Sequence, residues 1–460
     1  MTIGSHVTVT GHVKLILKNG ADLTVNGGIN VPTGSTFTVY GQQNGTGNLT
    51  SIGTNGYAGI GGTGSDVNFG TIILAAKGRI IATGDTRAAG IGGGGRMHNG
   101  ESVNGSIHIY QGTIEATGGS WAAGIGGGAD SSTDCTITID GGTIIAQGGQ
   151  DNAGIGGTNG SKQITINGGT VTAHGGNTGA GIGGSYDASG GSITITGGVI
   201  DADSIGGGSA GNGGPGGTIV ISGGVVTAER IGAGATNQEG SFSTTGSGNA
   251  VIFAGSITDQ SGKNGWSGLI FQGNEGKVYG NSYIVDKDLT IPADKTLTTE
   301  NGETLTVTSG VTLTNNGSIQ VNQGGTYSGA QPSGNTVTYQ IDWNTNGDDT
   351  VDDTTYVAYG QTPSHTDGSQ TGDAQYSYQF TGWTPTLTAV TGTATYTAQF
   401  TQNVNSYQVT VPTDPGYTVE YTDNTTLEYG STFTFSLDIT QGYYKTSDFE
   451  IGRASCRERV

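Results

Sequence analysis

The stretch that decides the fold reads Thr136-Ile-Thr-Ile-Asp-Gly-Gly-Thr-Ile-Ile-Ala-Gln147, followed shortly by Ala153-Gly-Ile-Gly-Gly157. Apolar and polar residues alternate in its first two segments, and this period of two is typical of a half-buried β-strand. Glycine pairs separate the segments and favour tight turns, because glycine adopts positive φ values without strain. The stretch therefore predicts three short strands joined by turns.

The same pattern recurs along the chain. The isoleucines of Ala-Gly-Ile-Gly-Gly lie 23–34 residues apart, and the copies, some degenerate, are centred on Ile60, Ile91, Ile125, Ile155, Ile182, Ile205 and Ile231. Repeats of this length with three strands each predict the rungs of a parallel β-helix (β-solenoid), in which each strand pairs with its copy ~4.8 Å away. A flat β-sandwich is the alternative, but its strands need not repeat one another's sequence. Facing the interior we expect Ile137, Ile139, Ile144 and Ala146.

Glycine is concentrated in these repeats. Residues 56–235 hold 54 of the 91 glycines in the 460-residue chain, whereas residues 332–449 hold 10. The glycines do not occupy every third position, so collagen is excluded. Strand-like segments continue on both sides of the repeats, so we predict one solenoid over residues 1–331, with glycine-rich repeats at 56–235, and a different β region from residue 332.

Charge and hydropathy exclude two classes of partner. The chain has 16 basic and 36 acidic side chains, giving a net charge of -20. Nucleic-acid binding requires clustered Lys and Arg. No apolar run approaches the ~18 residues of a membrane span. We therefore expect no nucleic-acid partner and no membrane insertion in this chain.

The end of the chain does not resemble the rest. The last ten residues, Ile451–Val460, contain three arginines and back-translate to a common sequencing adapter. We expect residues 450–460 to be an artefact, and the natural termini, with any signal or anchor, to lie outside this fragment. Cys135 is then the only natural cysteine, which excludes an intramolecular disulfide. Its position before Ile137 predicts a small core residue.

The region after residue 332 contains four motifs. They are Tyr339-Gln-Ile-Asp-Trp343, Val357-Ala-Tyr-Gly-Gln-Thr-Pro363, Phe380-Thr-Gly-Trp-Thr-Pro385 and Ala394-Thr-Tyr-Thr-Ala-Gln-Phe400. With these motifs the segment Val337–Phe400 resembles the internalin B-repeat, a module of bacterial surface proteins. The resemblance implies a small β-grasp-like module over 332–404. Residues 405–449 resemble a second, truncated β module, of β-grasp-like or β-sandwich-like type.

The glycine-rich repeats carry a second resemblance. The Ala-Gly-Ile-Gly-Gly region is similar to repeats in large secreted bacterial proteins, and some related solenoids are labelled carbohydrate-binding. No functional residue carries over from them.

A row of acidic residues is the first candidate site. Aligning the rungs on the alanine that closes each second strand places Asp203 beside Glu229, in a row that also holds Thr117, Gln147 and His174. Together with Asp201, these carboxylates would crowd on one face and repel one another unless a cation or proton intervenes. Oxygen ligands of this kind suit Ca²⁺, and no other cofactor is expected. Paired carboxylates for glycoside hydrolysis and a solvated polar face are the other interpretations.

Aromatic residues beside the repeated turn are the second candidate. Tyr57 and Trp121 precede the Ala-Gly-Ile-Gly-Gly segment and Tyr186 follows it. Their faces are suited to stacking on sugar rings. Because their offsets from the turn differ, a continuous platform is not predicted, and scattered exposed aromatics are the alternative.

A third candidate is the acidic segment from Asp342 to Asp353. It fits the first half of a calcium-loop pattern, but Asp353 stands where the pattern has Glu and no helix is predicted on either side. Residues 338–343 and 354–359 instead predict two strands around an Asn346-Gly347 turn, so a hairpin is favoured over Ca²⁺ capture.

Taken together, the sequence predicts a secreted or wall-attached bacterial surface protein that acts as a non-catalytic adhesion or display stalk. The expected partner is a polysaccharide or a host or microbial surface. The alternative is a β-helix enzyme, a lyase or hydrolase, acting on polysaccharide. A lyase site for acidic polysaccharide combines carboxylates with clustered Lys and Arg, but the basic residues of the repeats are spread out.

Overall fold

The computed structural model describes residues 1–95, 102–129, 132–158, 162–235, 238–244, 249–258 and 265–443. The predicted artefact at 450–460 lies outside these residues. The chain divides into two compact units, the first formed by Met1–Ile319 with Gly324–Thr336 and the second by Gln320–Gln323 with the chain from Val337. Among the described residues, none forms a helix with the length and hydropathy that a membrane span requires.

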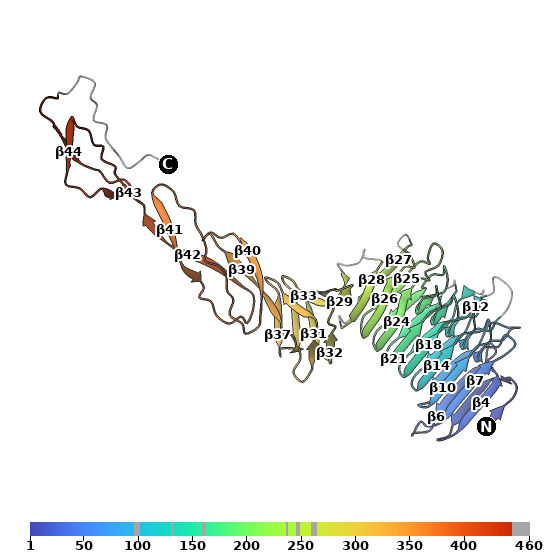
Figure 1. The fold of residues 1–460 in the computed structure, drawn as a ribbon. Coiled ribbons are helices and arrows are strands. Elements are labelled where there is room, and N and C mark those ends of the chain that lie inside the picture. The colour runs from blue at the N-terminus through green and yellow to red at the C-terminus, as the bar shows by residue number, and fades with distance from the viewer. Residues whose placement is uncertain are drawn as a thin grey trace. The chain divides into compact units, whose positions relative to one another are not determined.

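Three parallel sheets form most of the first unit. Sheet 1 contains β3 (His12–Leu17), β6 (Thr36–Gly41), β9 (Thr71–Ala75), β13 (Ser106–Ile109), β17 (Thr136–Ile139), β20 (Gln163–Ile166), β23 (Ser192–Ile195), β25 (Gly217–Ile221) and β27 (Gly240–Ser243). Sheet 2 contains β1 (Thr2–Ile3), β4 (Asp22–Gly27), β7 (Asn48–Gly53), β10 (Arg79–Thr83), β14 (Thr113–Thr117), β18 (Thr143–Gln147), β21 (Thr170–His174), β24 (Val199–Gly206), β26 (Val225–Gly232), β28 (Val251–Ile257) and β29 (Gly268–Gln272). Strands of sheet 2 follow one another in chain order (Figure 1).

Sheet 3 contains the Ala-Gly-Ile-Gly-Gly segments and a few strands of other sequence at its two ends. It contains β2 (Val7–Thr8), β5 (Ile29–Asn30), β8 (Ile60–Gly61), β11 (Ile91–Gly92), β15 (Ile125–Gly126), β19 (Ile155–Gly157), β22 (Ile182–Gly184) and then the last residues of β24, β26 and β28. A short additional pair, β12 (Ser102–Val103) with β16 (Ser132–Thr133), lies outside the three sheets. Each rung thus passes through sheets 1, 2 and 3 in turn, as the repeat predicts.

The predicted register is confirmed. Ile137 pairs with Ile107 and Ile164, and Ala146 pairs with Ala116 and Ala173. All four predicted interior side chains of this rung (Ile137, Ile139, Ile144 and Ala146) are completely buried. A buried isoleucine contributes about 1.5–3 kcal/mol relative to an exposed one, so the stacked columns account for much of the solenoid's stability. Cys135 is also buried, as predicted.

A column of glycines explains why Ile-Gly recurs in the sheet 3 strands from β8 to β26. Gly126 has a φ of 130° and pairs with Gly92 and Gly156 on either side. A Cβ added to Gly126 would overlap the carbonyl oxygen of Gly156 in the next rung. The same overlap recurs at every step from Gly61 to Gly206. Glycine is therefore required both by the backbone conformation and by the close approach of neighbouring rungs.

The parallel ladder of sheet 2 is interrupted near residue 273. β29 pairs antiparallel with β30 (Glu275–Tyr279), because Gly273 supplies a φ of 60° for a tight turn. Parallel pairing then resumes in short stacks made of β31 (Ser282–Val285), β34 (Thr304–Val307) and β37 (Thr326–Gly329), and of β32 (Leu289–Ile291), β35 (Leu313–Asn315) and β38 (Ser333–Gly334). β33 (Thr296–Thr299) pairs with β30. The region 1–331 is thus solenoid-like but not one unbroken ladder.

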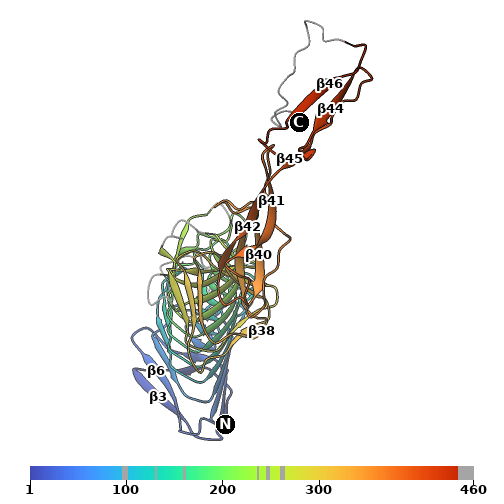
Figure 2. The same ribbon diagram turned by 90° about the vertical axis from the view of Figure 1, so that its left-hand side faces the viewer.

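The second unit begins with a mixed sheet. Its strands are β39 (Thr338–Asn344), β40 (Asp353–Ala358), β41 (Tyr376–Thr384) and β42 (Ala394–Val404), and β39 also pairs with the end of β36 (Ser318–Val321). β39 and β42 are parallel, β40 pairs antiparallel with β39, and β41 pairs antiparallel with β42. Figure 2 labels β40, β41 and β42 of this sheet. This pairing suits a β-grasp-like sheet, although no helix packs on it among the described residues. Beyond it, β43 (Ser406–Gln408) pairs with β45 (Thr426–Glu428), and β44 (Tyr417–Tyr421) with β46 (Phe435–Ile439).

The acidic segment of this unit forms the predicted hairpin. β39 and β40 are antiparallel on either side of Asn346-Gly347, and Gly347 has a φ of 82°. The carboxylate of Asp352 accepts hydrogen bonds from Thr345, and that of Asp348 accepts them from Thr350. These carboxylates close the loop on itself, so the hairpin interpretation is confirmed.

Candidate functional site

The turns on either side of sheet 3 stack rung upon rung. We call the segment that leads from a sheet 2 strand to a sheet 3 strand the entry turn, and the segment that follows the sheet 3 strand the exit turn. Successive entry turns are joined by backbone hydrogen bonds, from Gly119 N to Ala88 O at 3.0 Å and from Gly149 N to Ala122 O at 2.9 Å. Side chains at equivalent turn positions therefore form rows parallel to the solenoid axis.

One such row is formed by the residues that lie four positions before each repeat isoleucine. Because those isoleucines are in register, Arg87, Trp121, Asp151 and Thr178 occupy consecutive rungs. The hydroxyl of Thr178 donates to Asp151 Oδ1 at 3.0 Å, which shows that neighbouring members of the row are in contact.

A pocket lies beside this row at Trp121. Its volume is about 240 Å³, and we call it the Trp121 pocket. The Trp121 and Tyr186 side chains, 41% and 53% exposed, both line it. The remaining lining residues are polar: Asp151, Asn152, Thr158 and Ser185. Two of the three predicted aromatic residues are therefore brought together, although they are 65 residues apart in sequence.

Neighbouring rungs hold both aromatic residues in place. The buried Asn152 donates from Nδ2 to the carbonyl oxygen of Trp121 at 2.8 Å, and its Oδ1 accepts the Ala153 amide at 2.9 Å. The Tyr186 amide donates to the carbonyl oxygen of Asp151 at 2.9 Å. The pocket is thus assembled from three successive rungs and depends on their register.

Two features of the exit turn remain without a structural reason. Ser185 is 2% exposed and lines the pocket, yet its Oγ has no hydrogen-bond partner. A buried hydroxyl without a partner costs about 1–3 kcal/mol. Tyr186 has a φ of 27°, a conformation that disfavours side chains other than glycine. Strain and unmet hydrogen-bonding capacity are common at binding sites, and here they occur in two adjacent residues of one turn.

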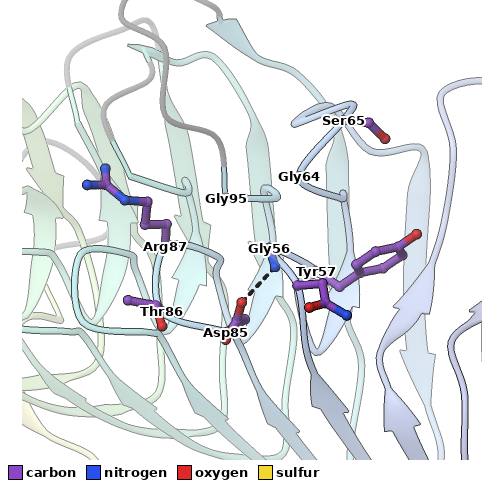
Figure 3. Close-up of a pocket in the computed structure, with 9 residues that line it drawn as sticks. Gly56, Tyr57, Gly64, Ser65, Asp85, Thr86, Arg87 and Gly95 are labelled. Carbon is purple, nitrogen blue, oxygen red and sulfur yellow. Dashed lines mark hydrogen bonds between the residues drawn. The ribbon is translucent and has the colours of Figure 1, made fainter.

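Tyr57, the third aromatic residue, lines a different pocket of about 560 Å³, which we call the Tyr57 pocket. Asp85 and Arg87 from the next rung also line it, and Asp85 Oδ2 accepts the Gly56 amide at 2.6 Å. Figure 3 shows that the Tyr57 and Arg87 side chains point in opposite directions, so backbone forms much of the wall between them. The ring of Tyr57 stacks on His6 at 5.0 Å between centroids.

The acidic row has the predicted register but does not form a group that could hold a metal ion. Thr117, Gln147 and His174 follow one another in sheet 2, and Asp201 pairs with Thr172 and Thr227. Asp203 binds His174 Nδ1 at 2.9 Å and the Gly175 amide at 3.0 Å. No three His, Cys, Asp or Glu side chains within the described ranges are arranged to bind a metal, and this includes Asp201, Asp203 and Glu229.

The comparisons with known proteins bear on the repeats. Residues 107–129, 137–161 and 164–186 match the family model described as beta helix repeat. The chain is a β-solenoid repeat protein. The three matched segments include all six residues that line the Trp121 pocket. Neither a curated protein nor a solved structure matches the chain.

Four pocket residues were missed in the sequence. These are Asp151, Asn152, Thr158 and Ser185. Asn152 lies at a position where most rungs have Ala or Gly, and Thr158 and Ser185 share one position where most other rungs have Gly. Aligning each rung on its isoleucine and searching for polar residues in otherwise small positions would have found Asn152 and Ser185. The pairing of Trp121 with Tyr186 could not be found in this way, because one belongs to an entry turn and the other to an exit turn.

Proposed function

We propose that this solenoid binds carbohydrate, without catalysis, through the Trp121 pocket. The observation that carries the proposal is the joining of two exposed aromatic side chains, Trp121 and Tyr186, with the Asp151 carboxylate in one hollow. Aromatic faces contact the C–H surfaces of sugars, while hydroxyl, amide and carboxylate groups bind their hydroxyls. Asp151 and Asn152 supply such groups beside Trp121.

A non-catalytic role is supported by the small number of carboxylates. Glycoside hydrolysis normally requires two carboxyl groups on either side of the scissile bond. Asp151 is the single carboxylate among the residues that line the Trp121 pocket, and Asp85 is the single one in the Tyr57 pocket. The alternative is a polysaccharide-degrading β-helix enzyme, and release of reducing ends from polygalacturonate would favour it.

The setting we propose is a bacterial surface. The segment Val337–Phe400 resembles the internalin B-repeat, and the mixed sheet of β39–β42 suits the β-grasp-like module that this resemblance implies. The protein would then be secreted or wall-attached and would act as an adhesion or display stalk. Its solenoid would bind a polysaccharide or a host or microbial surface.

A glycan array probed with the full chain tests this function. We expect selective binding to a set of related glycans, and a Trp121→Ala variant should weaken it about 30-fold, or ~2 kcal/mol, because a stacking surface at the centre of the site is lost. Circular dichroism would verify that the variant keeps its β structure.

The matched control is Tyr110→Ala. Tyr110 is an equally exposed aromatic residue, 49% exposed, and it follows strand β13 in sheet 1, away from the pocket residues. Its loss should leave binding unchanged. Two results would contradict the proposed function. One is that no glycan binds, and the other is that Trp121→Ala binds as tightly as Tyr110→Ala and the original chain.

A further inference from the structure

The two pockets lie along one row of the solenoid. The Tyr57 pocket is lined by residues of two consecutive rungs, among them Gly56 and Arg87. The Trp121 pocket begins on the next rung, where the Trp121 amide donates to the carbonyl oxygen of Thr86 at 3.2 Å. Arg87 and Trp121 are therefore neighbours in the same row, one lining each pocket.

The length of this row matches a polymer better than a single sugar. The two pockets together involve five consecutive rungs, and at ~4.8 Å per rung they extend over about 19 Å. Chains of β-1,4-linked hexopyranoses are extended and ribbon-like, which suits a straight row of this length. Several consecutive sugars of such a chain would lie along the row.

The charges along the row favour a neutral chain. Its pocket-lining residues include one arginine, Arg87, and two carboxylates, Asp85 and Asp151. Both carboxylates already accept hydrogen bonds, from the Gly56 amide and from the Thr178 hydroxyl. A polyuronate would place a carboxylate on most rungs, and this row contains no matching series of cations.

We infer that the two pockets are parts of one groove for an extended, neutral, β-1,4-linked polysaccharide that runs parallel to the solenoid axis. The inference rests on the proposed function, because it extends the same site from the Trp121 pocket to the Tyr57 pocket. The aromatic rings at Trp121 and Tyr186 bind one end of the segment, and the polar turns around Asp85 and Arg87 bind the other.

Calorimetric titration of the full chain with cello-oligosaccharides and chito-oligosaccharides of two to six sugars tests this. In at least one series the affinity should rise by about tenfold or more between three and five sugars and then level off. Equal affinity for all lengths would overturn the groove, while leaving a single-sugar site at Trp121. Binding to neither series would also overturn it, and the glycan array would then decide separately whether any carbohydrate binds.

Variants at the two ends of the groove refine the test. Arg87→Gln or Tyr57→Ala should reduce the affinity for the hexamer to that for the trimer without changing trimer binding. Arg79→Gln is the matched control, because Arg79 pairs with Glu115 at 2.6 Å on sheet 2. Loss of hexamer affinity in Arg79→Gln as well, or in neither of the groove variants, would contradict a shared groove.

Discussion

Lys162 is a charged side chain inside the solenoid. It is completely buried, and its Nζ donates to the carbonyl oxygen of Thr158 at 3.0 Å. Gly191 in the next rung leaves room for it, because a Cβ there would overlap Lys162 Cγ. Burial is the main cause that lowers the pKa of Lys162 to about 8, against the opposing influence of Cys135 and Asp134. Burial likewise raises the pKa of the Cys135 thiol to about 12.

This lowered pKa predicts a pH dependence of stability. Between about pH 8 and pH 10.5, Lys162 is neutral in the folded chain but still protonated in the unfolded chain, so the unfolded state binds more protons. Stability should therefore rise with pH in this window, and the gain is lost again as the pH falls through 8. Urea unfolding at pH 7 and pH 10 should show a rise of up to about 3 kcal/mol relative to Lys162→Met.

The comparison with Lys162→Met isolates this group, because tyrosines and other lysines titrate alike in both proteins. Methionine has a similar volume and no charge, so the variant should also be the more stable of the two at pH 7. Identical pH profiles for the two proteins would show that Lys162 is not buried as a charged group.

At the scale of the element, the glycine column of sheet 3 is the feature that is most sensitive to change. Gly126→Ala should destabilise the solenoid by about 3 kcal/mol or more, because the new Cβ meets the Gly156 carbonyl oxygen at a φ of 130°. Thermal unfolding of the full chain measures the effect. Gly4→Ala is the control, since no atom lies within 4 Å of its added Cβ. Equal unfolding temperatures for the two variants would contradict the stacked geometry of sheet 3.

The strands themselves could be predicted from the sequence because their signal is local. Alternation in Thr136–Ile139 and Thr143–Gln147 gives the inward face directly, and repetition gives the register of each strand with its copy. The antiparallel turn at Gly273 was missed, although a two-residue Gly273-Asn274 loop between two strand-like segments is itself a hairpin signal.

The candidate site was only partly predictable for a related reason. Exposed aromatic residues are recognisable in the sequence, so Trp121 and Tyr186 were found. Their shared pocket depends on turns whose conformations are irregular, and on hydrogen bonds such as that of Asn152, which no periodic pattern specifies. The acidic row shows the opposite case. Its register was predicted correctly, but Asp203 binds His174 and the three carboxylates do not form a metal-binding group.

At the scale of the whole molecule, the stacking of rungs explains both the stability and the site. Interior side chains of rung after rung, from Val9 to Ile270, join into one continuous hydrophobic cluster. Each rung contributes one residue to every row on the surface, so a binding surface of any length can be built by varying turn residues while the glycine column and the isoleucine columns stay constant.

The most direct test of carbohydrate binding by the solenoid is hydrogen exchange of the full chain with and without its best-binding glycan from the array. We predict slower exchange of the backbone amides in residues 119–123, 149–152 and 185–188, whose turns surround Trp121 and Tyr186, and unchanged exchange in sheet 1. Protection confined to sheet 1 or to residues 337–443, with none in these turns, would contradict the account.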